Sequence, residues 1–217
     1  MLKLKSQAIL LAAIAPMTFL AGCKSSMDFD ETGGVKIARS ACPAVAIATY
    51  TGDITTFSSP TKRTVGAIDV TASLANLQTN CTGDSDPIGV TASFDVLATR
   101  AAPGPARQVV FPWFATMIRG GNDIQSKQTG QVVISFADGA TRGTGHASVT
   151  GSVSRSLAVL PEDVLKRITR KRKVGDADAA LDPLTEPSVR DAVLKANFEM
   201  LVGFQLSEEQ LAYNATR

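Results

Sequence analysis

The chain has few of the residue types from which catalytic sites are built. Its 217 residues include one histidine, His146, one tryptophan and two tyrosines. Neither a G-x-S-x-G nucleophile turn nor an H-E-x-x-H zinc motif occurs in it. A Ser-His-Asp or Cys-His hydrolase would have to use His146 as its base. We therefore predict a protein that is not an enzyme and that has no cofactor and no metal. A hydrolase built on His146 is the alternative.

The composition also lacks a strong charge of either sign and is poor in aromatic side chains. The formal net charge is +2, and aromatic residues make up 6% of the chain. Nucleic-acid-binding domains carry a clear excess of basic residues, and sites for nucleotide bases use aromatic rings for stacking. The composition therefore favours neither a nucleic-acid-binding protein nor a protein with a stacking site.

No apolar run is long enough to cross a membrane as a helix. The run Ala8–Leu20 has about 13 residues, whereas roughly 20 are needed to span the hydrocarbon core. It follows Lys3 and Lys5 and leads into the sequence L-A-G-C at Leu20–Cys23. A basic start, a short apolar run and small residues before a cleavage point are typical of a secretory signal peptide.

These residues resemble the signal peptide and lipobox of bacterial lipoprotein precursors. The resemblance implies that residues 1–22 are removed and that the thiol of Cys23 is acylated, which would anchor the mature protein to membrane lipid. In enterobacterial lipoproteins an Asp after the cysteine favours retention in the inner membrane. Here that position is Lys24. By resemblance, the protein is expected in the outer membrane of a Gram-negative cell, facing the periplasm.

A polar segment follows the lipobox cysteine. Residues 23–40 contain the pair Gly33-Gly34 and are predicted to form a tether between lipid and fold, with a short strand at Val35–Ala38. Lys3 and Lys5 leave with the signal peptide, so the 22 basic side chains fall to 20, equal to the 20 acidic ones. The mature chain has a formal charge near zero, which again gives no reason to expect a nucleic-acid partner.

Cys42 and Cys81 are the two cysteines that remain if Cys23 is acylated. Exported proteins fold in an oxidising compartment, where cysteine pairs form disulfides. A bond between the two would close a loop of about 40 residues and stabilise the fold by roughly 4 kcal/mol in the chain-entropy account. Their spacing does not match a C-x-x-C redox or metal motif. We predict a structural disulfide.

From residue 41 to about residue 153, apolar residues recur at every second position, which is typical of strands with one buried face. Predicted strands are 44–48, 52–57, 68–75, 88–96, 108–119, 130–136 and 146–153, with turn signals such as Asp138-Gly139 between them. We therefore predict a mainly β protein, with an immunoglobulin-like antiparallel β-sandwich at residues 41–156. Trp113 follows both cysteines, so the Cys-Trp-Cys order of true immunoglobulin domains is absent.

Helical spacing replaces this alternation after Leu157. Pro161–Lys173 begins with proline and acids and ends with bases, as the helix dipole favours. Pro187–Val202 carries apolar residues at helical spacing, and Gly203 would cap it. Ser207–Gln210 reads S-E-E-Q, a capping box that would open a last helix. Residues 157–217 are predicted to form a C-terminal segment of two to three helices.

Six basic residues lie within eight positions at the end of the first predicted helix. They are Lys166, Arg167, Arg170, Lys171, Arg172 and Lys173. Such a run can contact anionic lipid headgroups or an acidic partner, each base near a membrane surface contributing on the order of 1 kcal/mol. It can equally be the solvated C-terminus of a helix, where bases are favoured. Both readings are open at this point.

The stretch Val109–Ile118 is the most apolar part of the chain after the signal peptide and contains Phe111, Trp113 and Phe114. Pro112 cannot donate a hydrogen bond to a neighbouring strand, which predicts an edge strand or a bulge. An exposed edge would make the three aromatic residues an apolar interface. A covered strand would place them in the core.

Together these features predict a membrane-anchored envelope lipoprotein. Its expected role is that of a non-enzymatic protein-interaction or accessory subunit, with an envelope protein as partner. The alternative is a lipoprotein that binds a small apolar or anionic ligand between sheet and helices. The sequence identifies neither the partner nor the ligand.

Overall fold

The computed structural model describes residues 40–59, 61–170, 175 and 181–216. The predicted signal peptide, Cys23, the strand predicted at Val35–Ala38, all of the tether before Ser40 and the bases Lys171–Lys173 lie outside these ranges. Among the helices that are described, none is both long and apolar enough to cross a bilayer.

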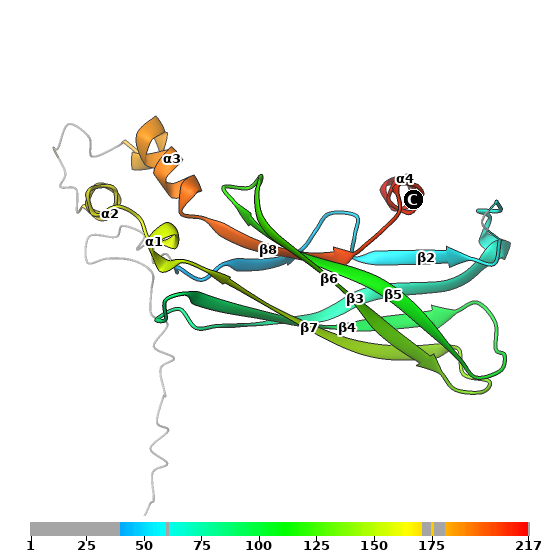
Figure 1. The fold of residues 1–217 in the computed structure, drawn as a ribbon. Helices are drawn as coiled ribbons and strands as arrows, with labels where there is room; N and C mark the ends of the chain where they lie inside the picture. The colour runs from blue at the N-terminus through cyan, green and yellow to red at the C-terminus, as the bar shows by residue number, and fades with distance from the viewer. Residues whose placement is uncertain (1–39, 60, 171–174, 176–180, 217) are drawn as a thin grey trace, which may run out of the picture. The chain divides into compact units, whose positions relative to one another are not determined.

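Two four-stranded β-sheets form the body of the described chain (Figure 1). The strand order is β1-β8-β5-β6 in the first sheet and β2-β3-β4-β7 in the second. All paired strands are antiparallel except β1 and β8, which run parallel. The strands are β1 Ala44–Ile47, β2 Asp53–Phe57, β3 Ile68–Cys81, β4 Ile88–Arg100, β5 Arg107–Arg119, β6 Asp123–Phe136, β7 Arg142–Val153 and β8 Phe198–Phe204. The prediction of a mainly β protein is confirmed.

The core lies between the two sheets and is built from the alternating apolar positions. Phe94 on β4 and Trp113 on β5 pack edge to face across it, with ring centroids 5.9 Å apart. Full burial of one large apolar side chain stabilises the fold by about 1.5–3 kcal/mol. On β4 the buried side chains are Ile88, Val90, Ala92, Phe94, Val96, Ala98 and Arg100.

The strand order is not that of an immunoglobulin domain. Immunoglobulin sheets have the order A-B-E-D and C-F-G, in which no three consecutive strands lie side by side. Here β2, β3 and β4 are neighbours in one sheet, and the hairpin β5–β6 lies in the other. Alternation of apolar residues reports which face of a strand is buried and carries no information about its neighbours.

The helix predicted at Pro187–Val202 is wrong in its second half. Helix α3 spans Pro187–Lys195, and strand β8 begins at Phe198 and pairs with both β1 and β5. The C-terminal segment is therefore helical only in part, because it supplies an inner strand of the first sheet. The buried side chains of β8 follow a period of two: Phe198, Met200, Val202 and Phe204.

Gly203 was predicted to be a helix cap and instead lies within β8, where the chain needs a residue without a side chain. A Cβ atom at this position would be 2.0 Å from Thr51 Oγ1 and 2.9 Å from Cε1 of Phe114. Both distances are shorter than any contact that packed atoms tolerate, so the glycine allows the close approach of these two neighbours.

The described helices are short. They are α1 Arg155–Ala158, α2 Glu162–Thr169, α3 Pro187–Lys195 and α4 Glu208–Thr216, with 3₁₀ turns η1 Val65–Ala67 and η2 Pro183–Thr185. Helix α2 ends at Thr169, before the predicted Lys173, because Arg170 already has a non-helical ψ of 123°. At α4 the predicted capping box is confirmed: the amide of Ser207 donates to Gln210 Oε1, and the amide of Gln210 donates to Ser207 Oγ.

Strand β5 is an inner strand, so the edge position predicted from Pro112 is wrong. It pairs with β6 along its whole length and with β8 from Trp113 to Arg119. Pro112 lies one residue beyond the pairing with β8, and its carbonyl accepts a hydrogen bond from the amide of Gln205. Since the N and the carbonyl of a strand residue face the same side, the missing N–H is on the β8 side, where the ladder has ended.

Candidate functional site

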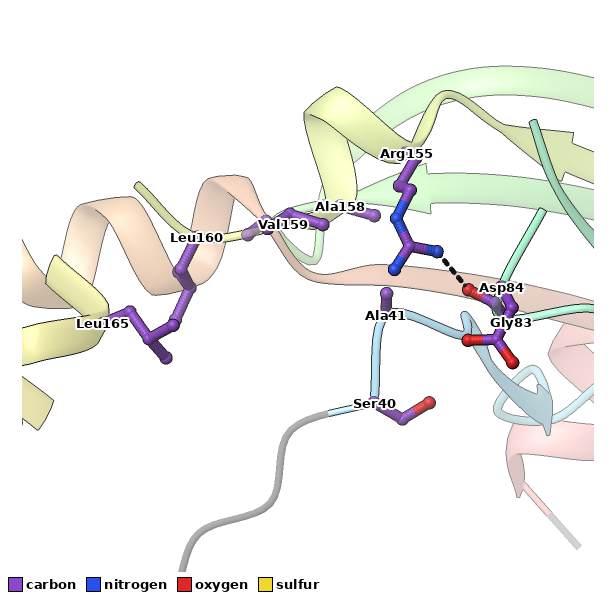
Figure 2. A pocket seen from close by; sticks show the side chains of 10 residues that line it. Ser40, Ala41, Gly83, Asp84, Arg155, Ala158, Val159, Leu160 and Leu165 are labelled. Carbon is purple, nitrogen blue, oxygen red and sulfur yellow. Dashed lines mark hydrogen bonds between the residues drawn. The ribbon is translucent and has the colours of Figure 1, made fainter. Parts of the chain in front are cut away.

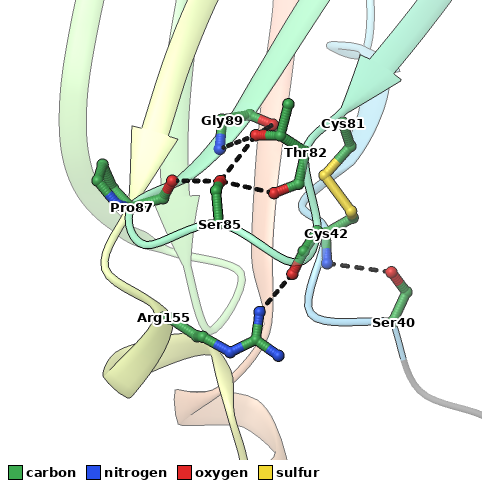
Figure 3. The surroundings of a disulfide bond; sticks show 9 residues. Ser40, Cys42, Cys81, Thr82, Ser85, Pro87, Gly89 and Arg155 are labelled. Carbon is green, nitrogen blue, oxygen red and sulfur yellow. Dashed lines mark hydrogen bonds between the residues drawn. A yellow bond between two sulfur atoms is a disulfide. The ribbon is translucent and has the colours of Figure 1, made fainter.

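A disulfide bond joins the two sheets at the end where the described chain begins (Figure 3). It links Cys42, two residues before β1, to Cys81, the last residue of β3, with Cα atoms 6.1 Å apart. Because β1 belongs to the first sheet and β3 to the second, the bond ties the layers covalently. The predicted disulfide is present, and it tethers an early strand to the end of a later one.

The turn between β3 and β4 lies directly beside this bond (Figure 3). Ser85 Oγ lies within hydrogen-bonding distance of the carbonyl oxygens of Thr82 and Pro87, at 2.8 and 2.7 Å. The amide of Gly89 donates to Thr82 Oγ1 at 2.9 Å. These contacts lie within one loop and hold it in a single shape, as serine and threonine side chains do in turns.

Arg155, the first residue of α1, forms two hydrogen bonds to this turn. Its amide donates to Asp86 Oδ1 at 3.2 Å. Its guanidinium Nη1 donates to the carbonyl oxygen of Gly83 (Figure 2). The side chain is half-buried. The start of α1 is therefore set by two contacts to a loop more than sixty residues earlier in the sequence, a relationship that no local pattern reveals.

A cavity of about 400 Å³ lies between this turn and the helices (Figure 2). This volume falls within the range of small-molecule sites, about 300–1,000 Å³. Its polar lining comes from Ser40, Asp84 and Arg155. Its apolar lining comes from α1, α2 and the segments that join α1 to α2 and α3 to β8: Ala158, Val159, Leu160, Leu165 and Ala196. A ligand bound between sheet and helices, the alternative that the sequence left open, would have room here.

The two charged residues of the cavity have no charged partner of their own. Among the described residues no carboxylate forms an ion pair with Arg155, and no cation forms one with Asp84. Within the described residues, neither side chain therefore has its charge neutralised by an ion pair. A guanidinium in this setting is a ready donor to a carboxylate or phosphate, and a carboxylate is a ready acceptor from an ammonium group.

The described part of the basic run is used largely within the protein. Lys166 pairs with Glu162 one helical turn earlier, at 2.6 Å, and Arg167 pairs with Glu186, the residue before α3, also at 2.6 Å. Ser188 and Arg167 together hold the pKa of Glu186 below its usual value, the Ser188 hydrogen bond being the larger cause. Arg170 follows the end of α2. Arg167 therefore links α2 to the start of α3, and Lys166 makes an ion pair within α2.

The apolar stretch of β5 lies mostly in the core. Phe111, Trp113 and Phe114 therefore do not form one exposed apolar surface. Phe111 is 1% exposed and Trp113 is 8% exposed. Phe114 points the other way, is half-buried, and lies under the ammonium group of Lys127 at 5.4 Å. The reason is the two-sided pairing of β5, which places alternate residues between the sheets.

His146 lies on the outer face of β7 and pairs with Asp95 of β4. The distance from His146 Nδ1 to Asp95 Oδ1 is 3.0 Å, and Asn76 donates to the other carboxylate oxygen. These two hydrogen bonds, that of His146 first, lower the pKa of Asp95. The His146 side chain is 64% exposed, and no hydroxyl hydrogen bond to its ring is present among the described residues. In the described part of the chain, the pair therefore has no hydroxyl group in the position that a triad nucleophile takes.

Sequence reasoning missed Arg155, Asp84 and the cavity between them. The run from Val153 to Pro161 showed neither strand nor helix periodicity over a useful length, and only folding brings it to the turn after Cys81. In the part of the chain that the structure describes, no three His, Cys, Asp or Glu side chains lie close enough to hold a metal ion. No protein-family model, curated protein or solved structure matches this chain.

Proposed function

We propose that the protein is a membrane-anchored envelope lipoprotein that acts as a non-enzymatic interaction or assembly subunit. The anchor would be acylated Cys23, and the location would be the periplasmic face of the outer membrane. We also propose that the two facing sheets form a β-sandwich of the immunoglobulin-like kind. Its strand order differs from that of immunoglobulin domains.

The observation that carries this function is the apolar surface at the helical end of the domain. Helices α1, α2 and α3 gather there (Figure 1). Four side chains from these helices and the residue after α1 are between 42% and 46% exposed: Leu157, Val159, Leu165 and Leu194. Single exposed leucines are ordinary, whereas several on adjoining short helices are typical of a surface that a partner covers. We call these four residues the helical-end surface.

In-cell crosslinking of a C-terminally tagged protein tests this function. We expect one envelope protein to be captured reproducibly, and to be lost when Val159 and Leu165 are both changed to serine. Leu97→Ser is the matched control, since Leu97 is 49% exposed on the outer face of the second sheet. Capture that persists in the double variant, or that Leu97→Ser removes equally, contradicts the proposal.

The anchor has its own test. Metabolic labelling with palmitate is expected to mark the wild-type protein and to leave Cys23→Ser unmarked and released from the membrane fraction. Labelling that survives this substitution would show that the acylated residue is not Cys23.

A second function, the binding of a small ligand, is supported by the cavity lined by Arg155, Asp84 and Leu165. Native mass spectrometry of the purified mature protein is expected to show a retained small-molecule mass. Leu165→Arg, which fills the cavity with a charged chain, should remove that mass. A protein that carries no added mass from any growth condition contradicts this second function.

A further inference from the structure

The cavity beside the disulfide presents one positive group, one negative group and an apolar wall. We propose that it binds a zwitterionic amphiphile, a molecule that carries an anionic group and an ammonium group at one end and an aliphatic chain at the other. This inference rests on the second function proposed above and specifies the chemistry of its ligand.

Arg155 supplies the group that would bind the anion. Its backbone amide and Nη1 are held by Asp86 and Gly83, which fixes the direction of the side chain. Its remaining N–H groups have no partner among the described residues, and no described carboxylate neutralises the charge. A fixed, half-buried guanidinium beside apolar side chains binds a phosphate or carboxylate more strongly than one in open water.

Asp84 balances the positive charge of Arg155 in the lining of the cavity. It lines the same cavity and, in the described part of the chain, makes no ion pair. A ligand with only an anionic head would meet Arg155 favourably and Asp84 unfavourably. A ligand that also carries an ammonium group satisfies both, and its net charge of zero matches the net charge of the lining.

The apolar wall accounts for the aliphatic part of the ligand. Val159 and Leu165 line the cavity and are 45% and 44% exposed, which leaves apolar area for a chain to cover. Covering it is favourable by about 25 cal/mol for each Å² removed from water. Figure 2 shows the leucines Leu160 and Leu165 on the side of the site away from Arg155 and Asp84, so head and tail contacts are separated in space.

Titration calorimetry of the full mature chain with two short-chain lipids below their micelle concentrations tests the inference. Dihexanoyl phosphatidylethanolamine is zwitterionic, and dihexanoyl phosphatidylglycerol is anionic with the same tails. We expect the zwitterion to bind at least about tenfold more tightly. Asp84→Asn should reverse this order, because it removes the contact to the ammonium and the repulsion of the anion. Asp123→Asn, at the exposed first residue of β6, is the matched control and should leave both affinities unchanged.

Asp84 makes no hydrogen bond in the described structure, so its substitution is not expected to disturb folding. Arg155→Lys, which keeps the charge, gives a second variant and should weaken both lipids. Equal affinity for the two lipids, or a preference that Asp84→Asn does not change, overturns the zwitterionic class. If neither lipid binds but native mass spectrometry still shows a retained ligand, the class fails and the second function stands. If neither lipid binds and no mass is retained, both fail.

The same chemistry can come from a bilayer lipid or from a free amphiphile. Cosedimentation with phosphatidylethanolamine vesicles, using the unacylated Cys23→Ser chain, separates the two sources. Sedimentation that Asp84→Asn weakens supports a bilayer source. Binding of the short-chain lipid without sedimentation supports a free one. Sedimentation that Asp84→Asn leaves unchanged shows that the cavity is not the contact and counts against the inference.

Discussion

Trp113 and Gly130 are cross-strand neighbours on β5 and β6, and the indole ring occupies the space that a side chain at position 130 would need. A Cβ atom built on Gly130 would be 2.2 Å from Cζ2 of Trp113. Trp113 is held on its other side by Phe94. The glycine is therefore part of how the core accommodates its largest side chain.

Gly130→Ala is expected to destabilise the protein by about 1–3 kcal/mol, because the ring must shift within a packed core. Urea unfolding measures the change in the free energy of unfolding. Gly66→Ala is the control, since a Cβ there meets nothing within 4 Å, and it should stay within about 0.5 kcal/mol of the wild type. Equal effects of the two substitutions would show that Trp113 is not fixed in this position.

Replacing both Cys42 and Cys81 by serine is expected to lower the free energy of unfolding by about 4 kcal/mol, in the chain-entropy account of a cross-link 39 residues apart. Wild-type protein unfolded in the presence of a reductant should show a similar loss. If the double variant unfolds at the same urea concentration as the oxidised wild type, the bond contributes nothing to stability.

Arg100 is the last residue of β4 and is 4% exposed. Within the described chain its guanidinium donates to four backbone carbonyls and lies over the ring of Phe136. The carbonyl oxygens are those of Gly104, Pro105, Ala137 and Ala140. Arg100→Met should destabilise the protein by about 3 kcal/mol, because it leaves these acceptors without a donor. The comparison is Arg142→Met on the exposed face of β7, which should change little. Matching losses in urea unfolding would count against a structural role for Arg100.

The pKa of Asp95 is expected to lie below its ordinary value of 3.8, with the hydrogen bond from His146 as the first cause. A carboxyl pKa lowered by folding means that its contribution to stability is present above the unfolded pKa and is lost as pH falls through the folded one. We therefore expect a loss of stability below about pH 4.

Carboxyl NMR titration measures this pKa directly. His146→Ala should raise the pKa of Asp95 towards 3.8 and reduce the acid sensitivity of unfolding in that range. Thr144→Ala, on the same face of β7 but opposite Leu97, is the control and should leave the titration unchanged. A wild-type pKa at the ordinary value would mean that the His146–Asp95 pair does not persist in solution.

The strands could be predicted from the sequence because their signal is local. Alternation located all seven strands before residue 157, and the expectation that the chain is exported let the two cysteines predict the disulfide. Strand β8 was missed because a pattern with Val189, Val193 and Ala196 at helical spacing runs directly into it, and no proline or glycine separates the two. What distinguished Phe198–Phe204 was its own alternation, which seven residues show only weakly.

The candidate site could not be predicted because its parts are distant in sequence. Arg155 and Asp84 come together only because β4 and β7 are neighbours along their full length, which places the turn before β4 next to the residues after β7. The prediction that Pro112 lies on an edge strand was wrong for a related reason. An inner strand can contain a proline at the point where the pairing with one neighbouring strand ends, because no ladder hydrogen bond is needed there.

The bond between Cys42 and Cys81 also decides how the domain responds to a pull on its N-terminal side. Tension that reaches residue 40 passes through Cys42 before it reaches β1, and the sulfur bridge transfers it to the end of β3. Strand β3 pairs with β4 there, and with both β2 and β4 nearer its start. The short strand β1 and its four-residue parallel pairing with β8 are bypassed. A chain anchored upstream of Ser40 would thus load its most extensively bonded sheet first and leave its weakest strand unstrained.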